Sequence, residues 1–145
     1  MTQISASSVI PAPISEVWKV VGNYAAIDAW HPAVNGSAFQ PGPAADQVDA
    51  IRQCDLDGGA RLIERQTARS EADHSLSYAI TESPMPMTNY VGTMRLRQIT
   101  DGNQTLFEWE ASFDPSPGAE DQLSGMMGQL YQAGFDSLKA RFADS

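Results

Sequence analysis

Residues 88–114, TNYVGTMRLRQITDGNQTLFEWEASFD, contain two segments in which apolar and polar residues alternate. Between them stands Asp101-Gly102-Asn103, which is typical of a tight hairpin turn. Because successive residues of a strand point to opposite faces, each segment has one apolar face. These apolar faces carry Tyr90, Gly92, Met94 and Leu96 in the first segment and Phe107, Trp109, Ala111 and Phe113 in the second. The stretch therefore predicts an antiparallel hairpin with one buried face and one solvated face.

Five further segments have the composition of strands and are bounded by turn residues. They cover residues 2–10, 34–40, 48–54, 61–69 and 74–82. Asp57-Gly58-Gly59 lies between the third and the fourth of them and predicts a second hairpin. Strands that are collected between two helical regions predict an α+β fold with an antiparallel sheet.

The first helical region follows Pro13, which is expected at the first position of a helix, where its missing N–H costs nothing. An apolar stripe from Ile14 to Val21 then ends at Gly22. Residues 24–29 can form a second short helix, which must end before Pro32.

The last helix is expected at about residues 117–142, with Ser116 as its cap and Pro117 at its first position. Three glycines inside this helix, Gly125, Gly128 and Gly134, each cost roughly 1 kcal/mol relative to alanine. Such residues either admit close packing on the sheet or leave room for another molecule.

The chain has 145 residues, a length that predicts one domain over residues 1–145, and its net charge is −9. This charge disfavours binding to nucleic acid or to an anionic membrane. Cys54 is the single cysteine, and no signal peptide or membrane-spanning segment is evident, so a cytoplasmic location is expected. One cysteine and two histidines cannot build a closed zinc site, so no metal is expected.

Three polar residues fall on the inward faces of the predicted strands. Arg52 and Glu64 lie on strands joined by the Asp57-Gly58-Gly59 turn, and Tyr90 lies on the strand that begins near residue 88. Buried charges are costly unless they are paired. Arg52 and Glu64 can therefore be an ion pair that only neutralises itself, or part of a cavity that a ligand enters.

Several stretches of the chain resemble the polyketide cyclase/dehydrase branch of the START/Bet v 1-like (SRPBCC) superfamily. They are IPAPISEVWKVVGNYAAIDAWHPAV at 10–34, DGGARLIERQTARSEADHSLSYAITESPMPMTNYVGTM at 57–94, and YQAGFDSLKARF at 131–142. The resemblance implies the helix-grip fold, in which a curved antiparallel sheet is wrapped around a long C-terminal helix. It also implies a hydrophobic cavity between the sheet and this helix.

A narrower likeness is to the plant lachrymatory factor synthases, through AIRQC at 50–54, LIERQ at 62–66 and NYVGTM at 89–94. This likeness implies catalytic roles for Arg52, Glu64 and Tyr90, the same residues that the alternation places inside.

Further residues are expected at the ligand. Tyr78, Met94, Trp109, Met127 and Tyr131 are predicted to line the cavity, while Trp30 and His31 are predicted near its entrance. His31 could act as an acid or base near neutral pH, or could simply cap a turn. Cys54 faces inward beside Arg52, but without a histidine partner it is a poor candidate nucleophile.

Two main functions remain open at this stage. The first is a cofactor-free cyclase, lyase or isomerase that uses Arg52, Glu64 and Tyr90 on a small hydrophobic or aromatic molecule with a polar handle. The second is a carrier that holds a lipid-like or aromatic molecule without chemistry. A third possibility is a partner-binding domain with an incidental cavity. The protein is expected to be a monomer or a homodimer.

Overall fold

The framework of the structure is one antiparallel sheet of seven strands. The computed structural model describes residues 1–143. In chain order its elements are β1 (Thr2–Ile10), α1 (Ile14–Val21), η1 (Tyr24–Ala29), β2 (Val34–Phe39), β3 (Ile51–Leu56), η2 (Asp57–Gly59), β4 (Arg61–Ser70), β5 (Ser75–Glu82), β6 (Met87–Ile99), β7 (Gln104–Pro115) and α2 (Glu120–Phe142). The strand order is β1-β7-β6-β5-β4-β3-β2, so each strand from β2 to β6 pairs with the strand that follows it in sequence, and β1 pairs with β7.

The hairpin of β6 and β7 has the predicted geometry. Gly102 and Asn103 adopt positive φ angles of 83° and 51°, which the tight turn requires. The register pairs Met94 with Trp109 and Leu96 with Phe107, and all four side chains are buried. The expected alternation of buried and solvated faces is therefore confirmed in this hairpin.

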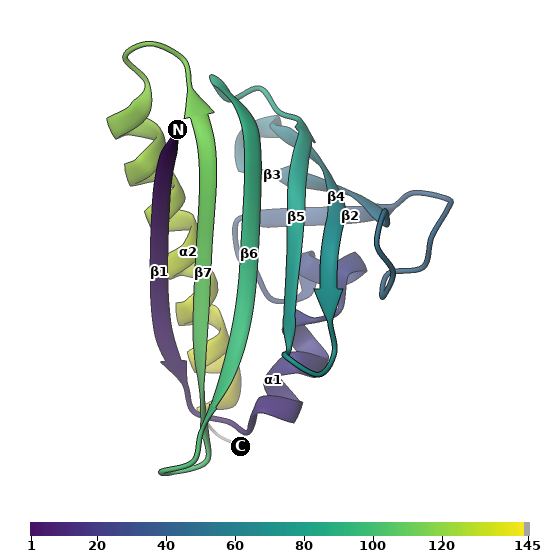
Figure 1. Cartoon of the computed structure of the whole chain (residues 1–145), viewed down its shortest axis with the longest axis vertical. Helices are drawn as coiled ribbons and strands as arrows, with labels where there is room; N and C mark the ends of the chain where they lie inside the picture. Colours follow the sequence, from purple (N-terminus) through teal and green to yellow (C-terminus); the bar gives the residue numbers. More distant parts are fainter. Residues whose placement is uncertain (144–145) are drawn as a thin grey trace.

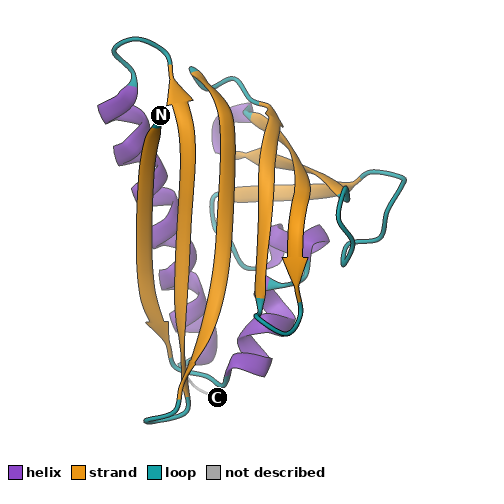
Figure 2. Cartoon of the chain, viewed as in Figure 1, coloured by secondary structure: helices purple, strands orange, loops and turns teal. Residues whose placement is uncertain are grey.

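The sheet curls around the long helix. β1, β7 and β6 run nearly side by side, whereas β2 and β3 cross behind the other strands (Figure 1). α2 packs against β1 and β7, α1 packs against β6 and β7, and η1 packs against β2 and β3. Figure 2 shows α2 running along the β1–β7 half of the sheet, with the shorter helices toward the other half. This arrangement is the helix-grip α+β fold that the sequence predicted.

Two element boundaries differ from the sequence prediction. β3 begins at Ile51 rather than at residue 48, because Asp49 has a φ of 73°, which is incompatible with a strand. Val48 consequently lies before the strand and is exposed. α2 begins at Glu120, because Gly118 adopts a φ of 82° and turns the chain after Pro117. Ser116 therefore makes no side-chain cap of this helix.

Strict alternation along residues 61–69 would turn the side chain of Arg69 toward solvent, together with those of Arg61 and Arg65, but the structure places it differently. The pairing of β4 with β5 shifts register between Gln66 and Ala68. A bulge of this kind reverses the side-chain alternation beyond it. The side chain of Arg69 is only 9% exposed, lies over the ring of Trp18 and donates to the carbonyl oxygen of Gly22.

The glycines of α2 fall into two classes. A Cβ atom on Gly134 would lie 3.0–3.2 Å from the rings of Trp30, His31 and Trp109, whereas a Cβ on Gly125 or Gly128 would meet no atom within 4 Å. Gly134 therefore lets three aromatic rings approach the helix, while the other two glycines only weaken its exposed face.

Gly134→Ala should lower the free energy of unfolding by about 1–2 kcal/mol, because these rings are packed against one another and cannot withdraw. Gly128→Ala, the matched control on the same helix, should raise it by about 0.5–1 kcal/mol. Urea denaturation measures both changes. A stabilising Gly134→Ala would contradict the close packing described here.

Candidate functional site

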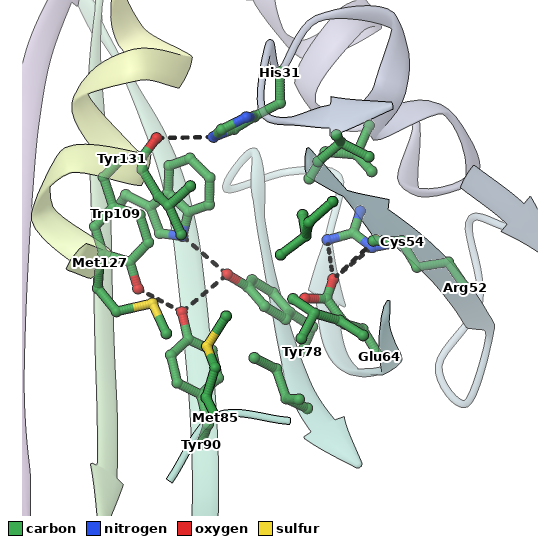
Figure 3. Close-up of a pocket in the computed structure, with 16 residues that line it drawn as sticks. His31, Arg52, Cys54, Glu64, Tyr78, Met85, Tyr90, Trp109, Met127 and Tyr131 are labelled. Carbon is green, nitrogen blue, oxygen red and sulfur yellow. Dashed lines mark hydrogen bonds and ion pairs between the residues drawn. The ribbon is translucent and has the colours of Figure 1, made fainter. Parts of the chain in front are cut away.

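A pocket of about 50 Å³ lies between the inner face of the sheet and α2. Eight of the predicted site residues line it: His31, Arg52, Glu64, Tyr78, Trp109, Tyr90, Met127 and Tyr131 (Figure 3). The remaining lining residues are mostly apolar: Ile27, Val34, Cys54, Leu56, Leu62, Ile80, Met85 and Leu130. The pocket is smaller than the roughly 300–1,000 Å³ of typical ligand sites. A ligand larger than a few heavy atoms must therefore displace side chains, and the flexible Met85 and Met127 are suited to this.

Two predicted ligand residues do not line the pocket. Met94 faces inward as expected, but it lies further along β6, where Leu76, Trp109 and the surrounding core fill the interior. Trp30 is 4% exposed and packs against His31, Phe107 and Trp109, so it belongs to the core and not to an entrance. Alternation predicts the direction of a side chain but not how far along the strand the cavity extends.

The pocket borders a second hollow. A mainly apolar hollow of about 440 Å³ adjoins it and shares Leu56, Met85 and Leu130 with it. These three residues come from the end of β3, the link between β5 and β6, and α2. Strand alternation could not identify Met85, which lies outside the strands, or Leu130, which lies on a helix. Leu56 lies beyond the expected strand segment 48–54.

Arg52 and Glu64 form the predicted ion pair. They are direct cross-strand partners on β3 and β4, and both are buried. Arg52 Nε donates to Glu64 Oε1 at 2.8 Å, and Nη2 lies 2.7 Å from the same oxygen without hydrogen-bond geometry. The pair thus places a carboxylate and a guanidinium inside an apolar interior.

The guanidinium is held from several sides. Its Nη1 donates to the carbonyl oxygen of Tyr24, and its carbon lies 3.9 Å from the centre of the Tyr24 ring and 5.3 Å from that of Tyr78. Burial, the largest single influence, would by itself lower the pKa of Arg52, but the acidic groups around it, Glu64 first, together outweigh burial and hold the pKa above its ordinary value. Arg52 therefore stays charged and cannot serve as a proton donor. Sequence reasoning missed Tyr24, which lies outside the strands.

The two oxygens of Glu64 differ. Oε1 receives Arg52 and the thiol of Cys54, whose Sγ lies 3.7 Å away. Oε2 makes no hydrogen bond within residues 1–143. It is also not one of the fully buried polar atoms that lack a partner in that part of the chain. Figure 3 shows it turned away from Arg52 toward the pocket. Glu64 therefore presents one free carboxylate oxygen to a molecule in the pocket.

Cys54 is not an activated nucleophile. Burial, followed by the negative charge of Glu64, raises the pKa of its thiol to about 12. Because the thiolate is the reactive form, this cysteine is inert near neutral pH.

Three phenols and an indole form a chain opposite the ion pair. Trp109 Nε1 donates to Tyr78 Oη at 3.1 Å, and Tyr78 Oη lies 3.2 Å from Tyr90 Oη. Tyr90 Oη makes a further hydrogen bond with Tyr131 Oη, which α2 contributes (Figure 3). Burial raises the pKa of each of the three phenols, so all of them remain protonated at physiological pH.

His31 fastens the loop before β2 to α2. Its Nδ1 accepts from the backbone N–H of Ala33 at 3.1 Å, and its Nε2 lies 2.8 Å from the carbonyl oxygen of Leu130. A backbone N–H can only donate and a carbonyl can only accept, so the ring must be neutral with its proton on Nε2. Both nitrogens are thereby occupied, and His31 is a structural clasp rather than an acid or base.

The fold and the pocket define a helix-grip protein with a largely apolar pocket that contains a buried ion pair and three phenols. Sequence comparison gives its family. The family model described as polyketide cyclase / dehydrase and lipid transport matches residues 1–143, and the chain belongs to this family. No curated protein matches the chain in sequence.

Solved structures with the same fold are plentiful. The protein XoxI from Bacillus cereus is 24% identical, with a TM-score of 0.90 over 99% of this chain and 97% of its own. A protein from Thermobifida fusca is 28% identical, with a TM-score of 0.89 over 99% of this chain and 95% of its own. One from Nitrosospira multiformis is 24% identical, with a TM-score of 0.85 over 97% of this chain and 96% of its own. These matches do not show the likeness to the lachrymatory factor synthases.

Residues 1–143 contain neither a membrane-spanning helix nor a cluster of metal-binding side chains. No helix in this part of the chain is both long and apolar enough to cross a membrane. Within the same residues, no three His, Cys, Asp or Glu side chains come together as metal ligands would.

The ion pair predicts non-additive stability losses. Arg52→Met and Glu64→Leu should each cost about 3–5 kcal/mol, because each leaves a buried charge without its partner. The double variant should cost clearly less than the sum of the two. Glu64→Gln should cost less than Glu64→Leu, since its amide oxygen still accepts from Arg52. Chemical denaturation of the set decides, and strictly additive losses would show that the residues do not act as a unit.

The His31 clasp predicts a loss of stability in mild acid. Burial, only partly offset by the Leu130 carbonyl, lowers the pKa of His31 below its usual 6.5. Below pH 6.5 the His31 ring therefore binds a proton in the unfolded chain but not in the folded chain. The free energy of unfolding then falls by up to about 1.4 kcal/mol per pH unit as the pH is lowered. The measurement is the melting temperature between pH 7.5 and 5. His31→Gln should flatten this dependence and the control His74→Gln should keep it; equal slopes in both variants would contradict the clasp.

Proposed function

We propose that this protein binds a small hydrophobic molecule with a polar handle in the pocket and catalyses a proton transfer on it without a cofactor. The observation that carries the proposal is the free Oε2 of Glu64 in a buried, largely apolar pocket. A carboxylate that only balanced an arginine would need no oxygen turned toward an open space. The reaction class is that of a cyclase, a lyase or an isomerase, each of which can begin with removal of a proton by a base.

Each site residue has a distinct role in this proposal. Glu64 takes a proton from the bound molecule on Oε2 and later returns it to a different atom. Arg52 is a positioning residue, since its Nε and Nη1 are used by Glu64 and by the Tyr24 carbonyl. Tyr90 is the middle member of the phenol chain, which as a whole holds the polar handle from the opposite side.

The apolar walls support this chemistry. A proton on carbon is removed more readily when the charge that develops meets fixed donors in a site without bulk water. The phenols and the carboxylate occupy opposite parts of one pocket, so a molecule between them can contact both (Figure 3). The family description, with its polyketide cyclase and dehydrase members, agrees with this class of reaction.

The second candidate is a carrier that binds the same kind of molecule without chemistry. It is favoured by the lipid-transport part of the family description and by the apolar hollow that adjoins the pocket. The two functions differ in whether Glu64 exchanges a proton with the ligand.

Proton transfer can be tested without the natural substrate. A panel of small carbon acids (ketones, nitroalkanes and sulfones) in deuterium oxide should exchange acidic C–H protons faster in the presence of the protein, as followed by proton NMR. Glu64→Gln should abolish the acceleration but retain binding, whereas Glu110→Gln, an exposed glutamate on β7, should leave it unchanged. Binding without accelerated exchange would support the carrier, and accelerated exchange that survives in Glu64→Gln would overturn the role of this residue.

A further inference from the structure

The phenol chain always has one hydrogen-bond donor to spare. Tyr78, Tyr90 and Tyr131 each supply one hydroxyl proton and Trp109 supplies one indole proton, so the chain has four donors. It contains three hydrogen bonds, and each of them uses one proton. No other acceptor within residues 1–143 bonds to these groups, so one phenolic proton remains unused.

The spare proton exists whichever way the hydroxyls rotate. If each phenol donates to the next, starting from Tyr78, the free proton lies on Tyr131. With the opposite direction it lies on Tyr78, which already accepts from Trp109. If both outer phenols donate to Tyr90, it lies on Tyr90. All three side chains line the pocket, so in every arrangement the spare donor belongs to a residue of the pocket wall.

An anion is poorly suited to this space. The charge of Arg52 is already compensated by Glu64, and the free Oε2 of Glu64 would repel a second negative charge. A carboxylate would also lose its hydration in exchange for a single phenolic donor, which is unfavourable in an apolar site. A neutral oxygen needs only that one donor.

We propose that the phenol chain is a binding subsite for a neutral acceptor oxygen, so that the ligand is an uncharged carbonyl compound such as a ketone, an aldehyde or a lactone. The inference rests on the proposed function, because it names the polar handle of the same ligand. An apolar ligand would strand the spare donor, whereas a carbonyl oxygen accepts from it and keeps the chain intact. The chain can also adjust the donor's position to the ligand by reversing its hydroxyl rotors.

The test compares three probes with equal numbers of non-hydrogen atoms: cyclopentanone, methylcyclopentane and butyrate. Amide chemical shifts in NMR titrations give their affinities for the wild-type protein. Cyclopentanone should bind about 3- to 10-fold more tightly than methylcyclopentane, the range that one net hydrogen bond supplies. Butyrate should bind more weakly than cyclopentanone. The infrared carbonyl band of bound cyclopentanone should lie at lower frequency than in an alkane solvent.

Two variants test the proton count. Tyr90→Phe removes the middle phenol and leaves free protons on both Tyr78 and Tyr131, so the preference for cyclopentanone should persist. Ser77→Ala removes a hydroxyl from the neighbour of Tyr78 on β5, where it bonds to Thr93 at 2.8 Å and does not line the pocket, and should leave the preference unchanged. In each variant, binding of methylcyclopentane reports that the pocket is intact.

The outcomes separate the two proposals. Equal binding of cyclopentanone and methylcyclopentane, tighter binding of butyrate, or loss of the preference in Tyr90→Phe would overturn the neutral-oxygen subsite. In each of these cases the pocket would still bind a ligand, so the proposed function would stand. If none of the probes binds, the pocket is no ligand site for molecules of this size, and both proposals fail together.

Discussion

The rest of the site depends on one constraint, a carboxylate and a guanidinium enclosed in an apolar interior. Neither Arg52 nor Glu64 can be buried alone, so β3 and β4 must hold them in direct register. The same need brings in the carbonyl oxygen of Tyr24 and the rings of Tyr24 and Tyr78 around the guanidinium. Once Arg52 has taken Oε1, Glu64 is left with one oxygen for the pocket.

The pocket is polar at two opposite parts and apolar between them. The ion pair comes from neighbouring strands, whereas the phenol chain joins β5, β6 and α2 through Tyr78, Tyr90 and Tyr131. α2 can contribute Tyr131 to this chain only because the helix is held at the correct position along the sheet. His31 binds its backbone at Leu130, and Gly134 admits the aromatic rings beneath it. The geometry of the site is thus a property of the whole fold rather than of one motif.

Several features could be read in advance because they depend on short-range chemistry. The Asp101-Gly102-Asn103 and Asp57-Gly58-Gly59 turns fixed two hairpins, and the period of two in their strands placed Arg52, Glu64 and Tyr90 inside. The errors arose where one residue breaks a local rule. Positive φ angles at Asp49 and Gly118 moved the starts of β3 and α2, and a bulge near Gln66 turned Arg69 inward. A sequence pattern does not reveal such breaks, because Asp49 and Gln66 are compatible with an ordinary strand or loop.

The sequence by itself determined the antiparallel α+β class, the inward polar residues and the pairing of Arg52 with Glu64, since these follow from alternation, turns and the cost of an unpaired buried charge. The helix-grip arrangement was implied by the resemblance to a known family. Only the tertiary structure decided which inward residues meet open space. It excluded Met94 and Trp30 from the pocket and included Met85 and Leu130. It also fixed the tautomer of His31 and joined three phenols into one chain. These outcomes depend on where separate elements pack against each other. The periodicity of one element contains no information about its position relative to another element.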